Sequence, residues 1–214
     1  MDFKSANRCK RIGLNGRAPT RRLLHACCRF GLGVTRRAPF DSPATDLGAL
    51  LALGAGQLAL VAGPSGSGKS RLLRALAAAL RAGPETVALR DLFAKIRSDR
   101  AVIDLMPLKL ESALRVLAAT GLADPFVLGR KPRELSVGEQ ARFVLARTLA
   151  QRRARRGWLL LDEFLTTLDR GSALATARSF RRAASEIAPD LRIVVASPQD
   201  DLVEALRPDL VVRV

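Results

Sequence analysis

The most constraining feature of this 214-residue chain is the stretch GPSGSGKS, Gly63 to Ser70, which lies between two apolar segments. The apolar run before it, 58–62, is typical of a buried strand, and the alanine- and leucine-rich run after it, 70–81, has helical spacing. The spacing G-x-x-x-x-G-K-S is that of a loop that cradles phosphate groups. Glycines let successive backbone N–H groups turn inward around an anion, and the following helix directs its positive end toward it. A plain turn would need no lysine–serine pair at the helix start, so the stretch predicts a phosphate-binding loop.

Each part of this loop has an expected role toward a nucleoside triphosphate. Lys69 is expected to reach the β- and γ-phosphates, and the Ser70 hydroxyl to bind Mg²⁺. The rest of the loop and the first helical residues are expected to surround the phosphates. The expected nucleotide-contacting residues are Gly63, Pro64, Ser65, Gly66, Ser67, Gly68, Lys69, Ser70 and Arg71.

Two adjacent acids follow a second apolar run in the stretch WLLLDEF. The run Leu159–Leu161 is typical of a buried strand, and Asp162 and Glu163 come directly after it. Ligands bind at the carboxyl ends of the strands in open α/β sheets, so these acids stand where a nucleotide would lie. Asp162 suits a Mg²⁺ partner, and Glu163 could accept a proton from the attacking water or orient it.

Apolar runs alternate with helical patterns along most of the chain, which predicts an α/β fold with a mainly parallel sheet covered on both faces. The expected strands are 58–62, 87–89, 101–105, 159–161, 192–196 and 210–214. The expected helices are 70–81, 112–120, 138–153, 172–187 and 202–206.

A third motif, ELSVGEQAR, precedes the long helical run and resembles the LSGGQ signature of the ATP-binding cassette (ABC) ATPases. Val137 and Glu139 depart from that signature, whereas Ser136 and Gly138 keep it. In this family the serine and nearby backbone amides clamp the γ-phosphate of an ATP held by a second subunit, and the resemblance implies that role for Ser136 and Gly138. Ser136 could equally serve only as the N-cap of the helix.

The resemblance covers residues 39–214 and implies a P-loop NTPase domain of ABC type. Its parts would be a mainly parallel sheet flanked by helices and a small helical subdomain at about 105–155. The stretch LTTLDR resembles the family's D-loop, with Asp169 at the aspartate position, and Phe40 lies about where the family stacks an aromatic ring on adenine. Phe40 could also be a core residue. The implied ligands are ATP and Mg²⁺, held between two copies of the chain packed head to tail.

The chain departs from the family at two places. The strand after the acid pair usually ends in a histidine that contacts the γ-phosphate, whereas this chain has Ser197, Pro198 and Gln199 there. Gln199 could hydrogen-bond a phosphate oxygen but carries no positive charge. The glutamine that opens the family's helical subdomain is also missing, because residues 71–134 contain none, and Asp104 is the one plausible substitute.

These departures lead to a hypothesis of MgATP binding with slow hydrolysis, in which closure of two subunits is the main output. A degenerate module that uses ATP structurally is an alternative, as is the ATPase subunit of a transporter with separate membrane chains. The chain also resembles a bacterial group of ABC-type ATPases that are fused to acetyltransferase domains.

Residues 1–38 are expected to form a loosely ordered basic arm ahead of the domain. Residues 1–37 carry ten lysines and arginines against one acid, and the whole chain has a net charge of +16, so nucleic acid is a possible partner. An organelle transit segment is a less favoured interpretation of this arm. The three cysteines and the one histidine all lie in it, and the cysteines fit neither a disulfide framework nor a zinc site. The longest apolar stretch, 47–63, is interrupted by polar and glycine residues, so we expect a cytoplasmic protein without a membrane span.

Overall fold

A computed structural model describes the main chain of residues 11–13, 18–30, 33–35, 44–80, 86–89, 96, 98–153 and 156–214. The chain divides into two compact units, residues 1–43 and 44–214. In the part of the chain that is described, no helix is both long and apolar enough to span a bilayer.

The first unit contains three short elements that were not among those expected from the sequence. They are strand β1 (Arg11–Gly13), helix α1 (Arg21–Arg29) and strand β2 (Gly33–Thr35). Strand β1 pairs with β2 in parallel. Thr20 is the N-cap of α1, because its hydroxyl oxygen accepts a hydrogen bond of 3.3 Å from the Leu23 N–H.

The second unit is built on a parallel sheet with the strand order β4-β5-β6-β3-β7. The strands are β3 (Leu58–Ala62), β4 (Thr86–Leu89), β5 (Gly157–Leu161), β6 (Leu191–Ser197) and β7 (Leu210–Arg213). Strand β3 is buried along its whole length, and its side chains alternate between two hydrophobic clusters. Burial on both faces explains why β3 is a continuous apolar run rather than an alternating one.

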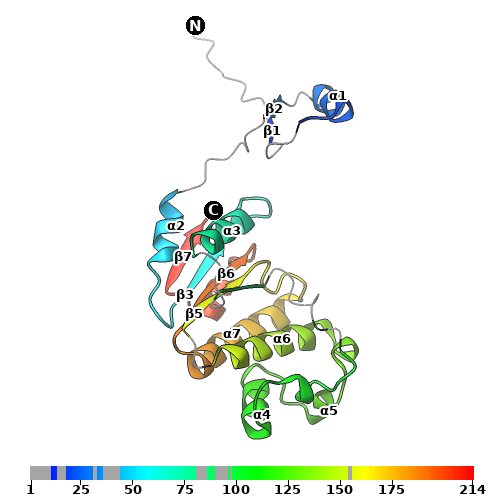
Figure 1. Ribbon diagram of the computed structural model, residues 1–214, viewed down its shortest axis with the longest axis vertical. Coiled ribbons are helices and arrows are strands. Elements are labelled where there is room, and N and C mark those ends of the chain that lie inside the picture. Colours follow the sequence, from blue (N-terminus) through cyan, green and yellow to red (C-terminus); the bar gives the residue numbers. More distant parts are fainter. Residues whose placement is uncertain are drawn as a thin grey trace. The chain divides into compact units, whose positions relative to one another are not determined.

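Helices cover the two faces of this sheet (Figure 1). Helices α2 (Ala44–Leu51) and α3 (Lys69–Ala79) pack on one face, together with Ala59 and Val61 of β3. Helices α6 (Val137–Arg152), α7 (Arg170–Ile187) and α8 (Leu202–Leu206) pack on the other face, with Leu58 and Leu60. The fold is therefore the predicted α/β fold with a parallel sheet between two helical layers.

A smaller helical region lies against α6 on the side away from the sheet. It consists of the 3-10 turns η1 (Ile103–Leu105) and η2 (Pro132–Glu134) and the helices α4 (Leu110–Ala119) and α5 (Pro125–Leu128). One side of α6 packs on the sheet through Val144 and Leu145, and the other packs in this region through Phe143 and Ala146. Helix α6 is therefore buried on two sides.

The strand expected at 101–105 is wrong, because this segment forms a turn and the 3-10 turn η1. Its buried residues are Val102 and Met106, four positions apart, which is a helical spacing rather than the alternation of a strand. Consecutive backbone hydrogen bonds of the 3-10 type run through it, from the N–H of Leu105 to the Val102 carbonyl and from Met106 to Ile103. The other expected strands and helices are present within a few residues of their predicted bounds. Helices α2 and α5, like α1 in the first unit, were not predicted.

We predict that Phe180→Ala destabilises the second unit by about 3–5 kcal/mol, because Phe180 is 1% exposed and its ring lies 5.5 Å from that of Phe164. Urea unfolding followed by the fluorescence of Trp158 measures the loss. Phe126→Ala is the matched control, since this ring is 82% exposed and its removal should change stability by less than about 0.5 kcal/mol. Equal losses in the two variants would contradict the placement of this core.

Candidate active site

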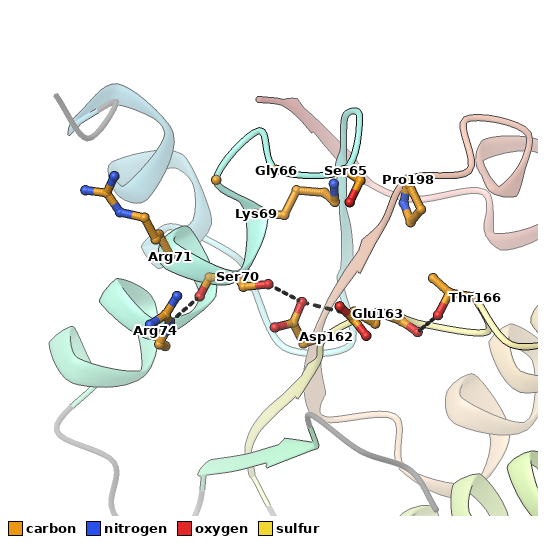
Figure 2. Close-up of a pocket in the computed structure, with 11 residues that line it drawn as sticks. Ser65, Gly66, Lys69, Ser70, Arg71, Arg74, Asp162, Glu163, Thr166 and Pro198 are labelled. Carbon is orange, nitrogen blue, oxygen red and sulfur yellow. Dashed lines mark hydrogen bonds between the residues drawn. The ribbon is translucent and has the colours of Figure 1, made fainter. Parts of the chain in front are cut away.

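A cavity of about 410 Å³ opens at the carboxyl ends of β3, β5 and β6 (Figure 2). It is bounded by the loop after β3, the acid pair after β5 and the first residue after β6. The lining residues are Ser65, Gly66, Gly68, Lys69, Ser70, Arg71, Arg74, Asp162, Glu163, Thr166 and Pro198. The structure therefore brings together the two motifs that the sequence places more than ninety positions apart.

The loop after β3 requires glycine at two positions. Gly63 has φ +154°, and a Cβ there would collide with the backbone carbonyl oxygen of Val214. Gly68 has φ +113° and is the N-cap of α3, where it has no side chain to occupy the space in front of the helix. The Arg71 N–H donates to the Gly68 carbonyl oxygen at 2.9 Å, and no side chain caps the helix start, which leaves room for an anion in front of it.

Lys69 is held at the base of this loop. Its side chain is nearly buried, and its ammonium group donates hydrogen bonds of 2.7 Å to the carbonyl oxygens of Gly63 and Pro64. The partial negative charges of these two oxygens stabilise the positive charge of the ammonium group. A bound phosphate oxygen would be a stronger acceptor for the same N–H groups, because it carries a full charge.

Ser70 and Asp162 connect the two halves of the site. The Ser70 hydroxyl donates a hydrogen bond of 3.0 Å to Asp162 Oδ1, which joins the first turn of α3 to the end of β5. Arg74, one turn further along α3, donates from its Nε to the Ser70 carbonyl oxygen at 2.9 Å. A hydroxyl and a carboxylate are hard oxygen ligands of the kind that Mg²⁺ selects, so this pair fits a magnesium ion.

Glu163 occupies an unusual backbone conformation. Its φ is +52°, in the left-handed region, which is costly for a residue with a side chain and is typical of functional sites. Hydrogen bonds hold the residue on both sides: its N–H donates to Asp162 Oδ1 at 3.1 Å, and its carbonyl oxygen accepts from the Thr166 hydroxyl at 3.1 Å. The carboxylate side chain is exposed at the cavity. This turn places a carboxylate where an attacking water could be oriented.

The residues of the signature stretch lie outside this cavity, at the exposed start of α6. The Ser136 hydroxyl accepts from the Glu139 N–H at 3.3 Å, and the Glu139 carboxylate accepts from the Ser136 N–H at 2.7 Å. This reciprocal pair is a capping box, so the N-cap role of Ser136 is confirmed. Ser136 is exposed and Gly138 is half-buried, and the neighbouring Val137 is 51% exposed. The start of α6 is therefore a surface that another molecule can contact.

Asp169 is the N-cap of α7. Its Oδ1 accepts a hydrogen bond of 3.0 Å from the Ser172 N–H. Hydrogen bonds from the Ser172 side chain and from this N–H lower the pKa of Asp169 from its ordinary value of 3.8. The Asp169 carboxylate therefore stays ionised in the folded chain and complements the positive end of α7.

The end of β6 has no histidine at the position where the family pattern has one. Ser197 is fully buried, and its hydroxyl accepts from the Gln199 N–H at 3.3 Å. Pro198 lines the cavity, whereas Gln199 is not among the described residues that do. The Gln199 amide oxygen is buried, and no described residue is its hydrogen-bond partner. Phe40, the expected adenine contact, lies outside the described residues.

Three lining residues were not expected from the sequence, namely Arg74, Thr166 and Pro198. A helical spacing of four from Ser70 could have pointed to Arg74, because such residues share a face of a helix. Thr166 lies three residues after Glu163, a spacing that suits a hydroxyl closing a tight turn. No signal in the sequence distinguishes Pro198 from Gln199 as the residue that faces the cavity.

The fold and the site together define a P-loop nucleotide-binding domain, in which a phosphate-binding loop after β3 is joined to an acid pair after β5. A family model described as "ABC transporter" matches residues 48–166, a span that is more than half of the chain and contains the loop, the signature stretch and the acid pair. The chain therefore belongs to the ABC transporter family and carries the ATP-binding domain of that family.

Curated relatives agree with this assignment. The chain is 39% identical over 139 residues to the aliphatic sulfonates import ATP-binding protein SsuB of Escherichia coli (strain K12), and the match covers 54% of this chain and 51% of that protein. The protein of the same name from Shigella sonnei (strain Ss046) matches with the same identity and coverage. The chain thus spans about half the length of the curated relatives it matches.

A solved structure supports the fold. The dimeric structure of MJ0796, a bacterial ABC transporter cassette, superposes with a TM-score of 0.52 at 18% sequence identity and covers 75% of this chain and 83% of that one. The resemblance to ABC-type ATPases fused to acetyltransferase domains stays a prediction from the sequence.

We predict that Asp169→Asn lowers stability at about pH 7 and that this loss shrinks as the pH falls below 3.8. The folded-state pKa of Asp169 is below its ordinary value, so its contribution is present above that ordinary value and is lost as the pH falls through the lowered one. Urea unfolding of the wild type and the variant over this pH range measures the difference. Asp190→Asn, at an exposed aspartate in the loop after α7, is the control for removing a surface carboxylate. A pH-independent effect of Asp169→Asn would contradict the ionised cap.

Proposed function

We propose that residues 44–214 bind MgATP in the cavity and hydrolyse it slowly, and that two copies close head to tail around two ATP molecules. The observation that carries this proposal is the 3.0 Å hydrogen bond between Ser70 and Asp162, because it brings a phosphate-binding loop and an acid pair into one site. Family membership supports ATP as the nucleotide.

The loop and Lys69 would bind the triphosphate. The N–H groups at the start of α3 face the β-phosphate, and the ammonium group of Lys69 exchanges its two carbonyl partners for phosphate oxygens. Ser70 and Asp162 would hold Mg²⁺, which when bound neutralises charge on the phosphate oxygens. Arg71 and Arg74, on the α3 side of the cavity (Figure 2), add positive charge beside the phosphates.

Glu163 would act on the attacking water. Its backbone is held by the hydrogen bonds to Asp162 and Thr166, and the exposed side chain lines the cavity. It orients the water and accepts its proton as the γ-phosphate is attacked. Positioning of this kind is the main protein contribution to phosphoryl transfer.

A second copy would complete the site. Ser136 and Gly138 lie outside the cavity of their own chain at an exposed helix start, which is what a contribution to another subunit's site requires. The capping box at the N-terminus of α6 uses the N–H groups of Ser136 and Glu139, so those of Val137 and Gly138 would be the ones to face a γ-phosphate. Asp169, which follows the acid pair, would lie in the same interface.

Slow hydrolysis follows from the end of β6. A histidine there would add a cation at the γ-phosphate, and Pro198 supplies neither charge nor a hydrogen-bond donor. Gln199 could still contribute a neutral hydrogen bond if its buried amide turned toward the nucleotide. The main output would then be closure and opening of the two copies rather than rapid turnover.

The ATPase subunit of an import system is the second candidate function. It is favoured by the 39% identity to proteins named as aliphatic sulfonates import ATP-binding proteins. In that case separate membrane chains would be the partners, and a cytoplasmic location is part of the same proposal.

We predict that Lys69→Ala weakens MgATP binding by about 100-fold, because it removes charged hydrogen bonds to two phosphates. Titration with MgATP in a calorimeter measures the change. Lys109→Ala is the matched control, since Lys109 is an exposed lysine far from the loop in sequence and does not line the cavity. Unchanged binding by Lys69→Ala would contradict the phosphate site. If the wild type releases no more phosphate than Lys69→Ala, ATP has a structural role only.

We predict that Glu163→Gln lowers phosphate release by at least about 100-fold while MgATP binding is kept, because the loss of a general base affects the chemical step. Analytical ultracentrifugation of this variant with MgATP should show a dimer that is absent without nucleotide. Glu111→Gln, at an exposed position of α4, is the control for the charge change. A monomer under all conditions would contradict the clamp, and undiminished hydrolysis would contradict the role of Glu163.

A further inference from the structure

Helix α1 in the first unit divides its surface between basic and apolar residues. Its basic residues recur at helical spacing, so they share one side of the helix. They are Arg21, Arg22, His25 and Arg29. The opposite side has the spacing i, i+1, i+4, i+5 and i+7 of an apolar face. The residues on it are Leu23, Leu24, Cys27, Cys28 and Phe30.

The apolar side is covered only along its centre. Cys27 is 2% exposed and Leu23 is half-buried, so the middle of the face is covered. At the margins Leu24 is 39% exposed and Phe30 is 77% exposed. A large phenylalanine ring and a leucine are thus open to solvent on the same helix that exposes three arginines.

The sequence around the helix offers these arginines no acidic partner. Between Asp2 and Asp41 the chain contains no aspartate or glutamate. The positive charge of α1 is therefore complementary to an external anionic surface rather than to its own chain neighbours. Leu24 follows Arg21 by three residues, so an exposed apolar group and a positive charge lie side by side on the helix.

We propose that α1 binds an anionic lipid surface through its exposed side, with the arginines on the lipid phosphates and Phe30, which follows Arg29 at the end of the helix, inserted between the headgroups. A basic helix with an exposed phenylalanine beside its arginines is suited to binding at a membrane interface. A nucleic acid backbone would satisfy the arginines but would leave Phe30 in water. This inference is independent of the proposed ATPase function.

Vesicle binding of the full chain tests the proposal. Co-sedimentation with vesicles of phosphatidylglycerol and phosphatidylcholine in equal parts should be strong, and binding to pure phosphatidylcholine should be at least about tenfold weaker. The double variant Arg21→Gln, Arg22→Gln should lose about twentyfold, since each basic residue near an anionic leaflet contributes about fivefold. The matched control is Arg178→Gln with Arg182→Gln, which removes the same charge from exposed positions of α7.

The apolar contribution is tested separately. Leu24→Glu with Phe30→Glu should lower vesicle binding by at least about tenfold. Leu110→Glu with Phe126→Glu is its control, because these side chains are 62% and 82% exposed in the second unit. Far-UV circular dichroism checks that each variant keeps the fold of the wild type.

Insertion is observed directly with a tryptophan at the helix end. In the variant Phe30→Trp with Trp158→Phe, the one tryptophan emission should shift to the blue on anionic vesicles and be quenched by lipids brominated in the upper acyl chain. No shift, or vesicle binding that the Leu24 and Phe30 changes leave intact, would overturn the proposal. Loss of duplex DNA binding by the Arg21 and Arg22 changes, without a tryptophan shift on vesicles, would assign the helix to nucleic acid instead.

Discussion

The hydrogen bond between the Ser70 hydroxyl and Asp162 Oδ1 ties together the parts of this molecule on which its chemistry depends. It spans from the helix after β3 to the loop after β5, two strands that are not neighbours, because β6 lies between them in the sheet. A hydrogen bond to a carboxylate contributes about 2 kcal/mol, which alone could not fix two loops in space. It is effective because the parallel sheet has already brought both strand ends to the same edge.

Burial of the sheet on both faces is what makes that edge rigid. Strand β3 is fully buried between two helical layers, so its end, where the phosphate-binding loop begins, has little freedom. Gly63 lets the loop pass close to Val214, the residue after β7. A side chain at position 63 would collide with the Val214 carbonyl oxygen. The contact with Val214 thus shapes the start of the loop, and Lys69 lies on the side that lines the cavity.

The sequence was sufficient for the features that depend on local spacing and strand direction. The loop, the acid pair and their convergence followed from two motifs, each after an apolar run, and the capping role of Ser136 from its place before a long helix. Features that depend on tertiary contacts were missed. The 101–105 segment has strand-like composition, yet Val102 and Met106 are buried together at helical spacing against the α4 and α6 region. The left-handed conformation of Glu163 could not be predicted from the residue types, because tertiary and turn contacts hold it. The Thr166 hydroxyl donates to the Glu163 carbonyl oxygen, and the Phe164 N–H donates to the Ala196 carbonyl oxygen at 2.9 Å.

Helix α6 links the nucleotide edge to the surface that carries the signature residues. One side of it packs on the sheet through Leu145 and Leu149, and the other holds the helical region through Phe143 and Ala150. A helix that is buried on two sides cannot rotate about its axis without breaking one of the two cores, since packed interiors resist small deformations. The exposed N-terminus at Ser136 therefore moves with the sheet as a rigid element. If a second copy closes on this one as proposed, a shift of the sheet would be transmitted to Ser136 without a hinge in α6 itself.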